Sequence, residues 1–104
     1  ALSLNANNLE GHIPSTIGNC SYLLSVWLSQ NNLSGGIPPQ LLSLSSLVEL
    51  ILSHNPLTGS LPSEVGKLKN LQYLGVSNTM LSNEIPSTLG SCISLEHLYS
   101  EQNF

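Results

Sequence analysis

Residues 47–70 read LVELILSHNPLTGSLPSEVGKLKN, and this stretch contains the pattern that decides the fold. Apolar and polar side chains alternate around Leu50, as they do in a short strand with one buried face. Asn55 follows that strand, and its amide group can bond backbone groups where the chain turns. Gly59 permits a left-handed backbone at the next turn, and Val65 returns toward the core. The stretch therefore predicts one strand, one turn and one short helical return.

The same pattern recurs every 24 residues along the chain, and many separate positions keep this period. Equivalent Leu residues are Leu23, Leu47, Leu71 and Leu95. Equivalent Pro residues are Pro14, Pro38, Pro62 and Pro86. The Asn position predicts a structural ladder of Asn7, Asn31, Asn55 and Asn103. The units are residues 1–22, 23–46, 47–70, 71–94 and 95–104.

One such unit cannot bury its Leu face alone, whereas stacked units can. Stacking places the strands side by side in a parallel sheet, about 4.8 Å apart. The strands lie closer together than the helical turns opposite them, so the stack curves. The period therefore predicts an α/β solenoid of about four units. Its strands form the concave face, and short 3-10 or helical turns form the convex face.

The motif LxxLxLxxNxLxGxIPxxLG, seen as LVELILSHNPLTGSLPSEVG, resembles the plant-type leucine-rich repeat. The resemblance covers essentially the whole chain. Departures are Thr79 at the ladder position, Asn83 at the turn Gly, Leu42 at the second Gly and Ser100 at a buried Leu. Ectodomains of this family usually carry Cys-paired caps, and residues 1–104 contain none. We therefore expect a single solenoid fragment without caps, whose ends expose core Leu side chains and favour self-association.

Composition excludes several classes of function. The chain has two basic residues, Lys67 and Lys69, and a formal net charge of −4, so it offers no surface for nucleic acid or for a polybasic membrane anchor. No apolar stretch approaches the roughly 20 residues that span a bilayer, so we expect no membrane insertion by this segment. Because there is no Asp, the kinase loop motifs are absent, and no catalytic, metal-binding or cofactor-binding constellation is found. The chain is therefore not expected to be an enzyme.

Two Cys residues and two glycosylation motifs remain. Cys20 and Cys92 lie three units apart, which is too far for a disulfide, so we expect both thiols to be reduced and buried. The N-x-[ST] motifs at Asn19 and Asn32 fall at outward turns, where a glycan could be attached. They favour a secreted context.

The outward strand positions hold the candidate binding residues. An outward Trp that shares one face with Ile and Tyr is unusual for a solvated sheet, and aromatic residues are enriched at binding hot spots. The alternative is that scattered exposed apolar residues are ordinary. The predicted partner-binding residues are Trp27, Ile51, Tyr73 and Tyr99, with Glu49, His54 and His97 around them.

The resemblance implies a peptide- or protein-binding module from the ectodomain of a plant leucine-rich-repeat receptor kinase or receptor-like protein. Such a segment would be extracellular or at the cell surface, in a parent protein anchored in the plasma membrane. Two alternatives remain open: a secreted inhibitor similar to polygalacturonase-inhibiting proteins, and an ice-binding repeat protein. The bulky middle row of the strand face argues against a flat ice-binding surface there.

Overall fold

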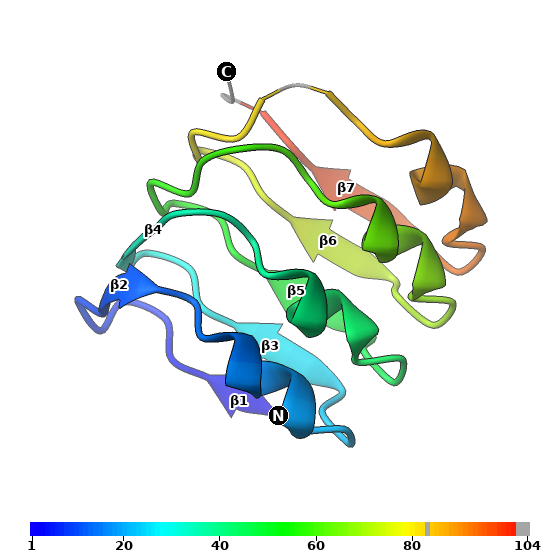
Figure 1. Ribbon diagram of the computed structural model, residues 1–104, viewed down its shortest axis with the longest axis horizontal. Helices are drawn as coiled ribbons and strands as arrows, with labels where there is room; N and C mark the ends of the chain where they lie inside the picture. Colours follow the sequence, from blue (N-terminus) through cyan, green and yellow to red (C-terminus); the bar gives the residue numbers. More distant parts are fainter. Residues whose placement is uncertain (83, 102–104) are drawn as a thin grey trace.

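The computed structural model describes residues 1–82 and 84–101, and its main feature is a parallel sheet with one short strand from each unit (Figure 1). In order along the sheet, the strands are β1 (Leu2–Ser3), β3 (Ser25–Trp27), β5 (Glu49–Ile51), β6 (Tyr73–Gly75) and β7 (His97–Tyr99). All neighbouring pairs are parallel, and each residue lies opposite the one 24 places later, such as Ser25 opposite Glu49. The predicted parallel solenoid is therefore confirmed.

Four 3-10 helices run along the side of the molecule opposite this sheet. They are η1 (Ser15–Asn19), η2 (Pro39–Ser43), η3 (Ser63–Lys67) and η4 (Ser87–Ser91). A Pro in extended conformation precedes each one, and its fixed φ is compatible with the start of a helix. The short helical turns expected on the convex side are thus present.

The core lies between the sheet and the 3-10 helices. Leu residues from the strands and from the returning turns fill it, and Leu50, Leu74, Leu68 and Leu71 are completely buried. Val26 and Leu50 alternate with half-buried neighbours along β3 and β5, as the period-two pattern predicts. Ser100 stands at a repeat position where other units have a buried apolar residue, and it is partly exposed.

A second, smaller parallel sheet pairs β2 (Glu10–His12) with β4 (Asn32–Ser34), and an isolated bridge joins Gly35 to Leu57. Here residues lie opposite those 22 places later, not 24. The ladder amide explains this shift, because Asn31 Oδ1 accepts the Leu9 N–H at 3.0 Å and so sets Leu9 beside Asn31. Pro62 itself is extended, but the pairing lies upstream of it, where backbone N–H groups are available.

Among the described residues, the amides of Asn31 and Asn55 form the ladder and join the second and third units to the units before them. Asn55 is buried. Its Nδ2 donates to the carbonyl oxygens of Leu28 in the preceding unit and Leu52 in its own unit, at 2.9 and 3.0 Å, and its Oδ1 accepts the Leu33 N–H. Asn31 repeats this arrangement, bonding Leu4 O and Leu28 O. The predicted ladder position Asn103 and the turn position Asn83 lie outside the described residues.

Thr79 occupies the ladder position of the fourth unit. Its hydroxyl donates to Val76 O and accepts the Leu81 N–H. The backbone bonds between units continue beside it, because the Met80 and Ser82 N–H groups donate to Leu57 O and Gly59 O. The substitution therefore removes an amide from the ladder without interrupting the stacking of the backbone.

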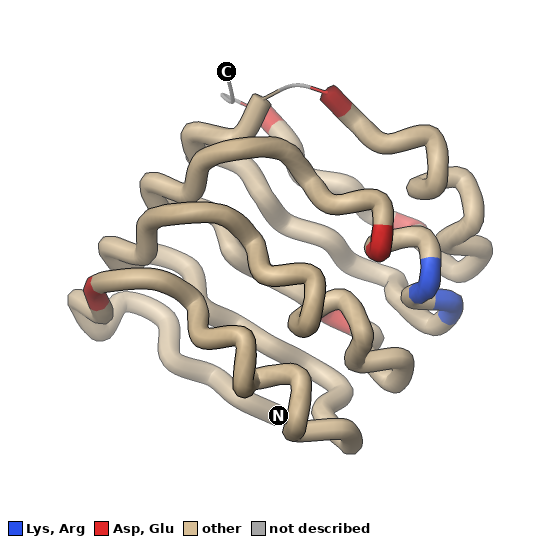
Figure 2. Tube along the Cα trace, in the orientation of Figure 1, with Lys and Arg blue, Asp and Glu red and all other residues tan. Residues whose placement is uncertain are grey.

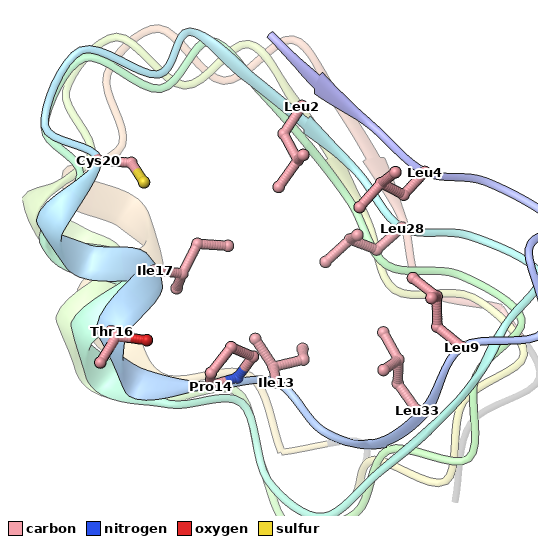
Figure 3. A pocket seen from close by; sticks show the side chains of 10 residues that line it. All are labelled: Leu2, Leu4, Leu9, Ile13, Pro14, Thr16, Ile17, Cys20, Leu28 and Leu33. Carbon is pink, nitrogen blue, oxygen red and sulfur yellow. The ribbon is translucent and has the colours of Figure 1, made fainter.

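The core is open at the first unit, where it forms an apolar pocket of about 290 Å³ (Figure 3). Leu4 lines this pocket and is 37% exposed, whereas its equivalent in the next unit, Leu28, is buried. The prediction that both Cys residues are buried is wrong for Cys20, which is exposed and lines this pocket. Cys92 is buried as predicted, and both thiols are free.

Candidate binding face

The outward side of the five-stranded sheet, called the strand face below, carries two aligned rows of side chains. The strand register defines these rows directly. The first row runs Ser25, Glu49, Tyr73, His97 and the second runs Trp27, Ile51, Gly75, Tyr99. Six of the seven residues predicted to bind a partner therefore lie side by side on neighbouring strands.

Ile51 and Gly75 form the centre of the strand face. A Cβ atom on Gly75 would lie only 3.2 Å from Ile51 Cδ1, so the Ile51 side chain lies across the glycine and buries it. Trp27 pairs with Ile51 on the other side. These three residues form a partly buried apolar strip, which is less exposed than outward positions of a sheet would suggest.

Trp27 carries a polar atom that the fold does not use. Trp27 as a whole is half-buried, yet its indole Nε1 is shielded from solvent and has no hydrogen-bond acceptor among the described residues. Ser29, two residues further along the chain, likewise has a shielded hydroxyl without a described partner. A buried unpaired donor costs free energy. This part of the face is therefore not optimised for stability.

Three flat rings lie parallel to one another on β6 and β7. The Tyr73 and His97 ring centroids are 4.9 Å apart with an interplanar angle of 6°, and those of His97 and Tyr99 are 6.0 Å apart at 7°. Tyr99 is 45% exposed. The three residues therefore form a continuous aromatic stack at one side of the strand face, which is open to solvent at Tyr99.

Two carboxylates border the apolar strip and the aromatic stack. Glu49 Oε1 accepts a hydrogen bond from the Ser25 hydroxyl at 2.9 Å, and Glu101 Oε2 accepts one from the Ser77 hydroxyl at 2.6 Å. The Ser77 bond, with a further contribution from a backbone hydrogen bond, holds the pKa of Glu101 below its usual value. Each carboxylate is thus held by a serine from the preceding unit.

His54 lies outside the two rows. It is exposed and adopts a left-handed backbone with φ of 61°, as do Ala6, Gln30 and Asn78 at the equivalent place in their units. All four follow a strand and precede a ladder position. Its side chain therefore belongs to the turn at the end of the strand face.

The repeat alignment places Gly75 and Glu101 in outward rows of this surface, but neither was among the residues predicted to bind a partner. The gap at Gly75 and the charge at Glu101 within those rows were the signals that could have added them. Glycosylation at Asn19 and Asn32 stays a prediction; both residues are exposed, at the end of η1 and the start of β4.

A metal site, a reactive thiol and a small-molecule pocket are the other kinds of site to consider. Within the described residues, no group of three or more His, Cys, Asp or Glu could hold a metal ion. Burial raises the pKa of the Cys92 thiol, which Lys69 partly opposes, and the Cys92 Sγ donates to Val65 O. The pocket at the first unit is apolar throughout, without a convergent set of polar groups. The strand face is therefore the best-developed candidate site.

Stacked 24-residue units with a five-stranded parallel sheet and an Asn ladder define a repeat scaffold that offers an open face. The pattern that describes the Leucine Rich Repeat family matches residues 1–20, 22–44, 46–68 and 70–92, and the chain belongs to that family. A search of curated protein sequences gives no match.

Solved structures of plant proteins resemble the chain closely. The ectodomain of the receptor kinase GASSHO1/SCHENGEN3 from Arabidopsis thaliana, in complex with CASPARIAN STRIP INTEGRITY FACTOR 2, matches 98% of this chain at 38% identity with a TM-score of 0.95. The BIR3–SERK2 complex from the same plant matches 99% at 38% identity with a TM-score of 0.87. A plant ice-binding protein matches 99% at 31% identity with a TM-score of 0.93.

The chain covers only part of each of these proteins, namely 12%, 54% and 34% of their lengths in the same order. Its structural neighbours include ectodomains of plant receptor kinases and complexes of such receptors with peptides or other receptor chains. Among the described residues, no helix is long and apolar enough to cross a membrane.

Proposed function

We infer that this chain is a ligand-binding module from the extracellular part of a plant leucine-rich-repeat receptor kinase, and that it recognises a peptide or protein through the strand face. Its proposed role is binding without catalysis. The parent protein would be anchored in the plasma membrane, with this segment outside the cell. Support comes from the family and from neighbours that are receptor ectodomains, one of them, the receptor kinase HAESA from Arabidopsis, in complex with a peptide hormone.

The observation that carries this proposal is the clustering of apolar and aromatic side chains on one open sheet. Trp27, Ile51, Tyr73 and Tyr99 occupy neighbouring strands and remain half-buried or exposed. Aromatic side chains of this kind supply large contact areas at low entropic cost when a partner covers them. Glu49 and His97 lie within the same rows, and His54 lies at their edge.

Two other functions remain as alternatives. The plant ice-binding protein among the neighbours keeps that possibility in view, but an ice-binding surface is expected to be flat and regular, whereas Trp27 and Tyr99 make the strand face bulky. An inhibitor similar to polygalacturonase-inhibiting proteins would also use an open face. Thermal hysteresis measurements test the first alternative, and inhibition of a fungal polygalacturonase tests the second.

A selection experiment tests the proposed function. Random dodecapeptides displayed on phage are selected on the immobilised 104-residue chain, and individual peptides are then measured against variants. Tyr99→Ala should weaken selected peptides about ten-fold or more, as loss of a hot-spot aromatic does. Tyr22→Ala is the matched control, because Tyr22 is 92% exposed and lies outside the strand face. Equal losses in both variants, or no selected peptide at all, would show that the strand face is not the binding site.

The open pocket at the first unit supports a second property, self-association of the chain end to end. Its lining is apolar, and Leu4 at its edge would be covered by the last repeat of a second copy. Sedimentation over a wide concentration range should show dimers or longer assemblies, and Leu4→Glu should shift the equilibrium to monomer. A monomer at every concentration would contradict this proposal.

A further inference from the structure

The charge of the strand face is entirely negative. The two basic residues of the chain, Lys67 and Lys69, lie at the end of η3 and in the turn after it, outside the two rows of the strand face (Figure 2). Lys69 Nζ also donates to Ser91 O. Glu49 and Glu101 therefore lie on the strand face without any Lys or Arg side chain among its residues.

Both carboxylates are held in place before any ligand arrives. Ser25 donates to Glu49 and Ser77 donates to Glu101, in each case across one unit. Each of these bonds uses only one of the lone pairs that a carboxylate offers, so acceptor capacity remains for a cation. A charged group that is already oriented loses less entropy when it binds a partner.

The aromatic stack lies beside the line that joins the two carboxylates. Tyr73 is opposite Glu49 in the first row, and Tyr99 is two residues before Glu101. The three rings are nearly parallel, and the planar guanidinium of Arg stacks on such faces while it bonds a carboxylate. The surroundings of the two acids therefore favour a side chain that is cationic, and planar in particular.

The strand register sets the spacing between the two acids. Glu49 is level with His97, which lies two strands away and four residues before Glu101. With strands about 4.8 Å apart and a rise of about 3.3 Å per residue, the two positions are separated by about 16 Å along a diagonal. An extended peptide spans that distance in about five residues. The diagonal passes over Gly75, with Tyr73 and Tyr99 beside it on the same flank.

We propose that the strand face binds an extended linear peptide carrying two basic residues about five positions apart, one at Glu49 and the other at Glu101. The residues between them pass over Ile51 and Gly75, beside the aromatic stack. Arg is preferred over Lys because the stack offers ring faces beside the carboxylates. This inference rests on the proposed function, since it names the chemistry of the ligand for the same surface.

The dodecapeptide selection tests it through the sequences that emerge. Selected peptides should be enriched in pairs of Arg or Lys at a spacing of four to six, and depleted in Asp and Glu. Glu49→Gln and Glu101→Gln should each weaken such a peptide about five- to ten-fold, with a smaller effect at high salt. Glu10→Gln, an exposed change on β2 in the second sheet, is the matched control and should leave affinity unchanged.

The possible outcomes separate the two proposals. Selected peptides that lose affinity on Tyr99→Ala but show no paired basic residues would overturn this inference and leave the binding face standing. Equal effects of Glu10→Gln and the two strand-face variants would also overturn it, because the charge would then act at long range. If no peptide is selected, both proposals fail. Both substitutions keep the size of the side chain, and circular dichroism checks that the variants remain folded.

Discussion

The interior of the solenoid and its strand face differ in how completely their polar groups are used. Inside, Asn55 is buried and both ends of its amide bond backbone groups of two successive units. On the strand face, the Trp27 indole N–H is shielded without a described partner, and apolar side chains remain partly open to solvent. The interior is thus adapted to stacking, whereas the strand face holds features that stacking does not require.

The largest effect is expected in the interior. Asn55→Ala would leave the Leu33 N–H buried without its acceptor and would remove one of the two amide donors to the Leu28 carbonyl, and should destabilise the fold by about 3 kcal/mol or more. Urea unfolding followed by circular dichroism measures this loss. Asn70→Ala, at an exposed position, is the control and should stay within about 0.5 kcal/mol. Similar midpoints for the two variants would remove the distinction between interior and surface.

A second test compares two glycines at equivalent positions in the 3-10 helices. A Cβ on Gly66 would lie 2.6 Å from the Thr88 carbonyl oxygen in the next unit, whereas a Cβ on Gly90 would meet nothing within 4 Å. Gly66→Ala should therefore cost about 1–3 kcal/mol through forced separation of η3 and η4. Gly90→Ala should be neutral or stabilise by about 0.5 kcal/mol through reduced freedom of the unfolded chain. Thermal unfolding of both variants would show the difference, and equal melting temperatures would contradict the close approach.

Trp27 tests the strand face itself. Because the side chain is half-buried, Trp27→Ala should cost about 1–2 kcal/mol of stability, less than Asn55→Ala, while strongly weakening a selected peptide. Trp27→Phe keeps most of the apolar contact and removes the unpaired N–H, so its stability should equal or slightly exceed that of the unchanged chain. A stability loss on Trp27→Ala as large as that of Asn55→Ala would place this side chain among the structural residues.

The smallest effect concerns the pH dependence of Glu101. Its pKa is lowered in the folded chain, so the bond to Ser77 adds stability above the ordinary Glu pKa and loses it as the pH falls through the lowered value. Ser77→Ala should bring the pKa of Glu101 up toward its ordinary value. NMR titration of the Glu101 side chain measures this shift, with Glu10 as an internal reference. An unchanged pKa in the variant would show that the serine does not hold the carboxylate.

The repeat period determined most of this architecture from the sequence alone. A spacing of 24 residues aligned the strands, and the structure pairs Ser25, Glu49, Tyr73 and His97 in the row that the spacing predicts. The buried Leu positions of the strands followed from the same alignment, because side-chain direction alternates regularly along a strand. The alignment also placed one short helical turn in each unit. The rows of the strand face therefore follow from the repeat period, although their use in binding stays a proposal.

Only the tertiary structure decided how neighbouring units meet. The 22-residue offset of the second sheet arises because the Asn31 amide bonds the Leu9 N–H of the preceding unit, a contact that no local pattern encodes. Cys20 was expected in the core by its position in the repeat, yet it is exposed because burial of a repeat position depends on a neighbouring unit. In the same way, Ile51 covers Gly75 because their strands are adjacent, and Ser77 orients Glu101 across one unit. Sequence periodicity sets which side chains face which way, whereas contacts between units set which of them are covered, paired and held.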